Sequence, residues 1–471
     1  MSSPILFSQH FKILPNVIDD AGLLDPFVDV DLPLFIDPLL IAKSSNRLIS
    51  TEGLDAFRLY FEQLVRLLVV SERERDPAWK AAERHLSLRE PPENGLGYGR
   101  RGRSGSSRPA RIRNQILRTT KQIIRLGSKD PEMISLMGFL EEDVGPDTIS
   151  DLTTRAMSEQ LCRLTNSFCI ENRVKVQEND ISEFHLPVLE SGDVKRPMIL
   201  IPKDLVRHLP MTDSWSDVWA ATQYNQALRD KVNRLLAGIV QPTIKEQKMA
   251  VREAVLQSSV VFDQFLSVLK ETASPYDKNE DVFGYYAFRD TLLKQGLVYP
   301  VSQYDIAKGP EEIKRVVLDA LNVFKHHVEN GNLWEALWAG DVPKRERASQ
   351  LIFYAIADAY ARVSGVDLDA EPNMGGGPVD FKFSRGYWAR VVVEMKRSGG
   401  KVEHGYTKQL EAYKSAALTE FAVYVVMDYG DGGNSIKRIS AIREYILSTG
   451  RRASDIVVID ARKKKSASKR N

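Results

Sequence analysis

Residues 375–398 read GGGPVDFKFSRGYWARVVVEMKRS, and this stretch predicts a strand hairpin. The three glycines permit backbone conformations that other residues avoid, and Asp380 stands where an apolar strand begins. The turn SRGY leads into a returning strand, ARVVVEMKRS, whose successive side chains point to opposite faces. One face carries Val391, Val393 and Met395, and the other carries Val392, Glu394 and Lys396. The strand is apolar until its charges, so Glu394 and Lys396 are neighbours at the end of a buried strand.

These charged side chains are the part of the hairpin that can carry chemistry. Hard divalent ions such as Mg²⁺ prefer oxygen ligands, and carboxylates on adjacent strands, Asp380 and Glu394, can hold one with room for water and a phosphate oxygen. Lys396 beside them can orient or deprotonate an attacking water and offset charge on the phosphate. A Glu-x-Lys tripeptide alone is more often a surface ion pair, so the prediction depends on the neighbouring elements.

Those elements form an ordered set. Before the hairpin, residues 344–363 predict a helix with Glu346 and Gln350 one turn apart on one face. After it, residues 402–416 predict a helix with Gln409 and Tyr413 four residues apart, and two apolar segments, FAVYVVMDYG and DIVVIDAR, predict strands. The alternation of helices and strands after Pro343 predicts a separate α/β domain over residues 343–462.

This set resembles the PD-(D/E)xK nuclease superfamily, whose members are restriction-endonuclease-like. The family's first motif reads Pro378-Val379-Asp380 here, with one residue inserted, and its second reads Glu394-Met395-Lys396. The resemblance implies a central mixed sheet flanked by helices and a catalytic core of Asp380, Glu394 and Lys396. It also implies Mg²⁺-dependent cleavage of phosphodiester bonds, chiefly in DNA, with Mn²⁺ as a substitute ion.

The resemblance extends to residues outside the hairpin. Glu346 stands where the superfamily's leading helix often bears a glutamate that joins the metal site; the alternative is a surface glutamate favoured by the helix dipole. Gln409 and Tyr413 resemble a Gln-x-x-x-Tyr element in which the glutamine supports the site and contacts nucleic acid, although Tyr413 can equally pack on the sheet. Lys408 and His404 are weaker candidates, for phosphate contact.

Residues 1–330 predict a mainly helical, α+β region of unknown role, suited to recognition, sensing or assembly and formed by one or two subdomains. We expect strands and turns over residues 1–50, with a buried strand ending at Pro38, and a strand at 198–201. Helices are expected at 52–71, 217–236, 243–272 and 311–329, and a helix after GPDTISD capped by Asp147, Ser150 or Asp151. His208 is expected to be a surface or packing residue, and residues 331–342 a linker.

Two segments carry local positive charge. Residues 94–109, NGLGYGRRGRSGSSRP, predict a loop; the simpler interpretation is a solvated connection, and the alternative is a phosphate-gripping loop using Arg100, Arg101, Arg103 and Arg108. Residues 463–471 predict a disordered basic tail, either solubilising or holding a polyanion.

The composition fits a soluble protein of several domains. A chain of 471 residues exceeds the roughly 250 to 300 that one core supports. The 65 basic and 63 acidic residues nearly cancel, so net charge does not indicate a polyanion partner. Cys162 and Cys169 form no disulfide framework or zinc motif. No targeting segment or window of about 18 apolar residues is present, so we expect a cytoplasmic protein without a membrane partner.

The sequence therefore favours a Mg²⁺-dependent DNA endonuclease, and analogy suggests bacterial defence against phage or plasmids. An RNase or a structure-selective nuclease is the alternative among enzymes, because the catalytic set contacts a phosphodiester and not a base. A non-catalytic nucleic-acid-binding or assembly module is the alternative outside enzymes. The chain has no ATPase motif, so a sensor or ATPase would be a separate partner, and homo-oligomer formation is left open.

Overall fold

The computed structural model describes residues 5–28, 32, 34–86, 93–96, 110–141, 144–191, 194–207, 226–236, 244–279, 281, 284–295, 304–344, 346–370, 379–386 and 388–464. Several predicted features lie outside these residues: the arginines of the 94–109 loop, His208, Pro378, the first part of the 217–236 helix and most of the basic tail. The structure is mainly helical, with a five-stranded mixed sheet near the C-terminus.

The sheet contains the predicted hairpin at its centre. Its strand order is β11 (Asp455–Asp460), β10 (Ala422–Asp428), β9 (Ala389–Arg397), β8 (Phe381–Arg385) and β7 (Asp367–Ala370). β7, β8 and β9 pair antiparallel, with Phe381 opposite Val393, whereas β9, β10 and β11 pair parallel. The hairpin of β8 and β9 is therefore confirmed, and β9 is the strand at which the antiparallel and parallel parts meet.

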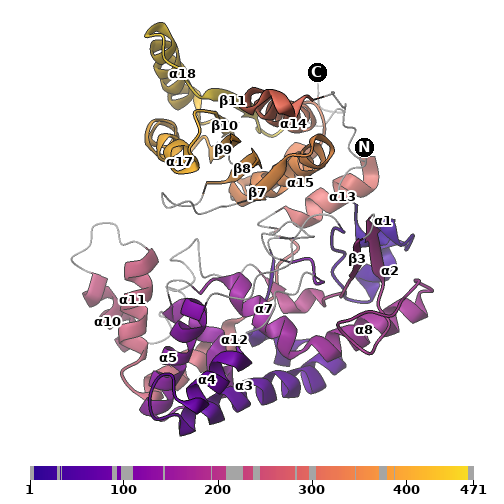
Figure 1. The fold of residues 1–471 in the computed structure, drawn as a ribbon, viewed down its shortest axis with the longest axis vertical. Helices are drawn as coiled ribbons and strands as arrows, with labels where there is room; N and C mark the ends of the chain where they lie inside the picture. The colour runs from indigo at the N-terminus through magenta and orange to yellow at the C-terminus, as the bar shows by residue number, and fades with distance from the viewer. Residues whose placement is uncertain are drawn as a thin grey trace.

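Helices cover both faces of this sheet (Figure 1). One face packs against α14 (Pro310–Glu329) and α15 (Glu346–Ser364). The other packs against α17 (Leu410–Ala417) and α18 (Gly433–Ser448), together with the short α16 (Val402–His404) and the π turn η7 (Gly405–Gln409). The two faces of β9 follow the predicted alternation, since Val391, Val393 and Met395 belong to one hydrophobic cluster and Val392 to the other.

Two elements of this unit were not predicted. β7 has the sequence DLDA, whose aspartates are uncommon in strands, and Asp369 is compensated by an ion pair with Lys382 on β8 at 2.7 Å. α18 connects β10 to β11, which were expected to follow one another directly. Because parallel strands cannot be joined by a tight turn, their connection requires a crossover, and α18 supplies it.

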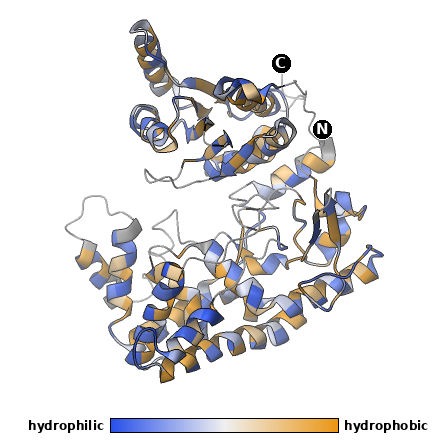
Figure 2. Cartoon of the chain, viewed as in Figure 1, coloured by the Kyte–Doolittle hydropathy of each residue, from blue (hydrophilic) through white to orange (hydrophobic). Residues whose placement is uncertain are grey.

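The N-terminal region is built mainly from helices that carry both apolar and polar residues along their length, as Figure 2 shows. The predicted helix at 52–71 is α3 (Leu54–Val70), which buries Phe57, Phe61, Leu64, Val65 and Leu68. The other helices of this region, in chain order, are α4 (Pro77–His85), α5 (Ala110–Leu126), α6 (Met137–Leu140), α7 (Pro146–Ala156), α8 (Ser158–Glu171), α10 (Gln226–Leu236), α11 (Ile244–Val255), α12 (Ser259–Thr272) and α13 (Tyr285–Gln295).

The first 50 residues differ from expectation. They contain α1 (Phe7–His10) and α2 (Pro15–Asp20), where strands and turns were predicted; Pro15 at the first helical position favours the second of these. The buried strand before Pro38 is present as β1 (Phe35–Ile36), which pairs with β4 (Val206–Arg207). Asp37 then caps the 3₁₀ helix η1 (Pro38–Lys43) by accepting a hydrogen bond from the Leu39 N–H.

Three further predictions for this region are corrected. The expected helix at 243–272 is broken into α11 and α12, because Ser258 takes an extended conformation and its hydroxyl caps α12. The expected caps Asp147, Ser150 and Asp151 lie inside α7, whose N-cap is Gly145; the Ser150 hydroxyl instead accepts from the Ile36 N–H. Residues 198–201, expected as a strand, belong to no strand; β3 (Val194–Pro197) ends just before them and pairs with β2 (Val188–Ser191).

The segment between the two regions is structured. Residues 331–342, expected as a linker, include the 3₁₀ helix η6 (Leu333–Leu337), β5 (Trp338–Ala339) and the start of β6 (Val342–Pro343). The helix predicted at 311–329 is α14, and it packs on the C-terminal sheet. The C-terminal packing unit therefore starts before the expected linker.

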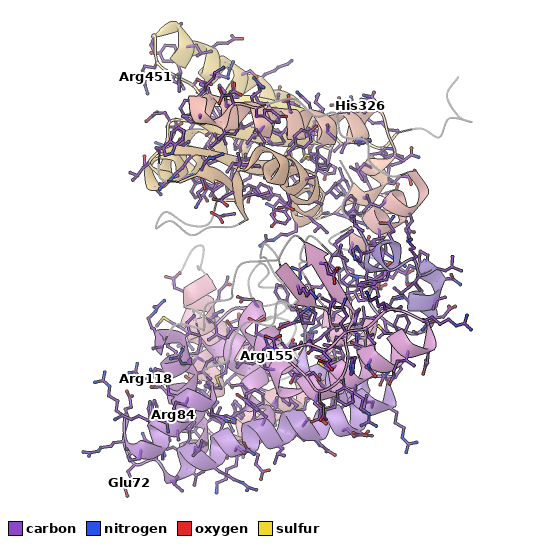
Figure 3. The ribbon with its side chains drawn as sticks, turned by 45° about the vertical axis from the view of Figure 1, so that its right-hand side comes forward. Glu72, Arg84, Arg118, Arg155, His326 and Arg451 are labelled. Carbon is purple, nitrogen blue, oxygen red and sulfur yellow. The ribbon has the colours of Figure 1, made fainter. Side chains whose placement is uncertain are left out.

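In Figure 1 the sheet unit lies at one end of the molecule and most of the N-terminal helices at the other, with α13 between them. Figure 3 shows Arg451 at the outer end of α18 and Arg84, Arg118 and Glu72 at the opposite end of the molecule. Among the helices of the described residues, none has both the length and the apolar character needed to cross a membrane.

Candidate functional site

Asp380 is held between the first helix and the central strand of the sheet unit. It directly precedes β8, and its Oδ1 accepts a hydrogen bond of 2.9 Å from the Gln350 side-chain amide on α15. Its Oδ2 accepts a hydrogen bond of 2.6 Å from the Met395 N–H on β9. Both carboxylate oxygens are therefore oriented by groups that belong to regular elements, which restricts the carboxylate to one position.

Glu394, Lys396 and Glu346 form a chain of ion pairs beside Asp380. Lys396 Nζ lies 2.8 Å from Glu394 Oε1 and 3.1 Å from Glu346 Oε1. The other oxygen of Glu346 accepts a hydrogen bond of 3.0 Å from the Arg397 N–H. The structure thus brings together four of the predicted site residues, Asp380, Glu394, Lys396 and Glu346, from β9, the start of β8 and the first turn of α15.

The carboxyl groups of this cluster are held in an environment that disfavours their charge. Burial raises the pKa of Asp380 well above its ordinary value, and the charge of Glu394 raises it further. Burial also raises the pKa of Glu394, although the nearby Lys396 ammonium opposes that rise. The Glu394 side chain is only 2% exposed. Two neighbouring carboxyl groups in such surroundings are both fully ionised only when a cation lies beside them.

Lys396 responds in the opposite sense. Burial alone would lower the pKa of its ammonium group, but the charges of Asp380, Glu394 and Glu346 outweigh burial and raise the pKa. Lys396 therefore keeps its proton at neutral pH. In this state it can offset negative charge.

The donor set fits a hard divalent cation. Glu394 Oε2 is buried and has no hydrogen-bond partner in the part of the chain that the structure describes, so one carboxylate oxygen remains available to a ligand. Three carboxylates surround a single ammonium group, which leaves negative charge uncompensated. Among the described residues, no group of three or more His, Cys, Asp or Glu side chains is already arranged around a metal position. In this cluster Lys396 Nζ lies beside both Glu394 and Glu346.

The predicted residues on the following helix lie differently. Tyr413 is buried against the sheet, and burial together with the charge of Glu394 raises its pKa, so its hydroxyl lies within the field of the cluster. Gln409 is half-buried in η7, and no hydrogen bond joins its side chain to the described residues of the cluster; Lys408 and His404 are exposed. The roles expected for Gln409 and Lys408 remain predictions.

Gln350 was noted in the sequence only as sharing a helix face with Glu346, and its contact with Asp380 was not foreseen. The signal was present in the spacing, since residues four apart project from one side of a helix. What the spacing lacks is the position of that side relative to β8, which depends on how α15 packs on the sheet. Figure 1 shows α15 lying across β7 and β8.

Comparison with known proteins identifies two regions of the chain. Residues 12–213 match the family model described as Domain of unknown function (DUF8370), and residues 313–431 match Domain of unknown function (DUF8371). The second match runs from α14 to just after β10 and so contains all four clustered site residues. No curated protein and no solved structure matches the chain.

Proposed function

We propose that this protein is a metal-dependent nuclease of the PD-(D/E)xK type, which hydrolyses phosphodiester bonds of DNA with Mg²⁺ as its cofactor. The observation that carries the proposal is the partly buried cluster of Asp380, Glu394 and Lys396, in which one oxygen of the buried Glu394 has no partner among the described residues. The αβββ order of α15, β7, β8 and β9 supports the restriction-endonuclease-like fold expected from the sequence.

Each residue of the cluster has a role that its contacts suggest. Asp380 and Glu394 would hold the metal, with Glu346 as a third carboxylate at its edge. Gln350 and the Met395 N–H fix Asp380 in place. Lys396, protonated at neutral pH, would offset the charge that develops on the phosphate. When bound, Mg²⁺ supplies polarisation of a phosphate oxygen and a water of lowered pKa.

A non-catalytic scaffold explains this cluster less well. Buried carboxylates with raised pKa values reduce the stability of the folded state at neutral pH unless a cation is bound. A module that only holds other proteins or nucleic acid gains nothing from that arrangement. Functional sites, by contrast, often combine burial with neighbouring like charges.

The test is cleavage of plasmid DNA, single-stranded DNA and RNA by the purified full chain with Mg²⁺ or Mn²⁺, followed on gels. We expect cleavage of DNA that EDTA abolishes. Lys396→Ala should lower the rate by about 10²-fold or more, the loss typical when a group that stabilises transition-state charge is removed. Asp380→Ala should abolish cleavage.

The matched control is Lys325→Ala. Lys325 lies on α14 and, like Lys396, pairs with a glutamate, Glu329, at 2.7 Å, but its Nζ is held at β11, where it also donates to the Val458 carbonyl oxygen. This variant should cleave DNA like the wild type. Undiminished activity in the folded Asp380→Ala protein would refute the proposal, and cleavage of RNA alone would replace DNA as the substrate.

A further inference from the structure

The N-terminal region is joined to the first turn of α15 by a buried ion pair. Asp281, just before α13, and Lys344, just before α15, lie 3.0 Å apart between Oδ2 and Nζ, and their side chains are 5% and 3% exposed. A pair so removed from water is costly to break, because either charge left alone is desolvated without compensation. The two helix starts are therefore held together.

Asp281 is a fixed anchor rather than a mobile surface carboxylate. Its Oδ1 accepts hydrogen bonds from the Tyr276 hydroxyl at 2.9 Å and the Tyr286 N–H at 3.2 Å. Its Oδ2 accepts a third from the Ala287 N–H at 3.0 Å, besides the bond from Lys344. Asp281 also adopts a positive φ of 39°, a conformation that is uncommon for non-glycine residues and that the local hydrogen bonds of an aspartate side chain help to hold.

A second contact lies three residues further on. Gly284 has a φ of +70°, and a Cβ atom built there would lie 2.6 Å from the Ala336 carbonyl oxygen and 3.5 Å from the Ala348 Cβ. Ala348 lies on α15 between Glu346 and Gln350. The absence of a side chain at Gly284 thus allows the N-terminal region to approach the first turn of α15 closely.

That part of α15 carries the two side chains that reach the cluster from outside the sheet. Glu346 binds Lys396 Nζ and the Arg397 N–H, and Gln350 binds Asp380. A shift of the first turn of α15 would move both side chains together. Loss of a partner that orients metal ligands in this way typically lowers metal affinity about 10- to 100-fold.

We infer that Lys344 and Asp281 are positioning residues for the metal site: through the first turn of α15 they place Glu346 and Gln350, so the site depends on the N-terminal region. The inference rests on the proposed function, which supplies the metal. It adds that residues far from Asp380 in sequence help to set the affinity for the ion. One of them, Asp281, lies outside both matched family regions.

The test compares Lys344→Met with Lys248→Met in the full chain. Lys248 is a matched control, because Lys344 and Lys248 are each 6% exposed when the whole residue is counted. Lys248 Nζ donates to the carbonyl oxygens of Glu141 and Val144, where α11 packs on α6. Mn²⁺ affinity is measured by calorimetry, and hydrogen exchange is followed in peptides that cover residues 346–350. Lys344→Arg keeps the charge and serves as the conservative variant.

We expect Lys344→Met to weaken Mn²⁺ binding by about 10-fold, the lower end of the range for residues that orient metal ligands, and to accelerate exchange in the first turn of α15. Lys344→Arg should recover most of the affinity. Lys248→Met should lower the melting temperature without either effect. Unchanged Mn²⁺ affinity in a folded Lys344→Met protein, or an equal loss in Lys248→Met, would overturn the inference.

The two proposals fail in different ways. A wild-type protein that binds neither Mn²⁺ nor Mg²⁺ would refute the nuclease proposal. Wild-type binding with no difference between Lys344→Met and wild type would leave the nuclease in place and refute the positioning role. Exchange at residues 346–350 that is no faster in Lys344→Met than in Lys248→Met would refute the joint itself, whatever the metal result.

Discussion

At the scale of single residues, Glu394 combines a role in the site with a cost to folding. The raised pKa means that the folded protein holds the Glu394 proton more tightly than the unfolded chain does. The stability that this group contributes is complete below its ordinary value of 4.5 and is lost as pH rises through the folded-state pKa. At neutral pH without metal, this carboxyl group therefore lowers the free energy of unfolding.

Glu394→Gln should accordingly stabilise the metal-free protein at neutral pH. The amide keeps an acceptor for Lys396 and avoids a buried charge, so we expect the melting temperature in EDTA to rise by on the order of 2 °C at pH 7.5. Below pH 4.5 the difference should vanish, since wild-type Glu394 is then protonated. Mg²⁺ should reverse the order, because only the wild type gains from binding. A variant less stable than wild type in EDTA at pH 7.5 would contradict this.

Gln350→Ala tests the group that orients Asp380. The variant loses the 2.9 Å hydrogen bond to Oδ1, which is partly buried. We expect about 10-fold more Mg²⁺ to be needed for half-maximal cleavage, with a smaller change in the rate at saturating metal. The measurement is a titration of cleavage rate against Mg²⁺. A loss of rate that excess metal does not restore would argue against an orienting role.

Sequence reasoning located the residues of this cluster but not their bonds. Alternation along β9 put Glu394 and Lys396 on one face, and both lie in the cluster. Glu346 had two interpretations, and its contacts with Lys396 and Arg397 place it beside the cluster. The bond from Gln350 and the orphaned oxygen of Glu394 depend on packing distances that no spacing rule supplies.

At the scale of elements, α15 is where the fold and the site meet. One side of the helix packs Phe353 on Phe324 of α14 and on Phe381 of β8. Its first turn reaches the cluster. The same turn contacts the N-terminal region, where Lys344 pairs with Asp281 and Ala348 lies beside Gly284. A helix fixed by three neighbours gives its polar side chains little freedom, which suits a site that must keep a set geometry.

Gly284→Ala should be more damaging than a φ penalty alone explains. Its backbone φ of +70° strains any larger residue, and the added Cβ would also meet the Ala336 carbonyl oxygen. Gly22→Ala is the matched control, because Gly22 has a φ of +68° and nothing lies within 4 Å of its Cβ position. We expect Gly22→Ala to cost about 1 kcal/mol and Gly284→Ala at least about 1 kcal/mol more, measured by denaturant unfolding. Equal losses would show that the contact with Ala336 is soft.

The same scale shows where periodicity is informative and where it fails. Long amphipathic helices such as α3 and α14 were predicted close to their observed bounds, because their apolar spacing is repeated over several turns. The break between α11 and α12 was missed, since a single capping serine interrupts an otherwise continuous pattern. α1 and α2 are too short for periodicity to reveal them.

At the scale of the whole molecule, one hydrophobic cluster extends through both regions. It includes Phe61 of α3 and Phe262 of α12 as well as Phe288 of α13, Phe353 of α15 and Val393 of β9. The C-terminal sheet unit is therefore packed directly against the rest of the chain through this shared cluster. Parts that share a core tend to unfold together.

We expect calorimetry of the wild-type chain to show one main unfolding transition. Breaking the joint between the regions should uncouple them, so Lys344→Met should broaden this transition or divide it into two, whereas Lys248→Met should shift it without dividing it. Two well-separated transitions in the wild type would mean that the shared cluster does not couple the regions.

The position of α14 also bears on how the sheet unit could be exchanged between proteins. α14 precedes the expected linker and was therefore assigned to the N-terminal region, but it packs on the C-terminal sheet. Its Glu329 accepts a hydrogen bond of 2.8 Å from the Asp460 N–H of β11, and the helix buries eight residues. A gene fusion that joined a new partner directly before α15 would strip one layer from the sheet and expose its apolar face. Recombination would preserve the unit only with a junction before Pro310, so α14 sets the smallest segment that can be inherited as a working piece.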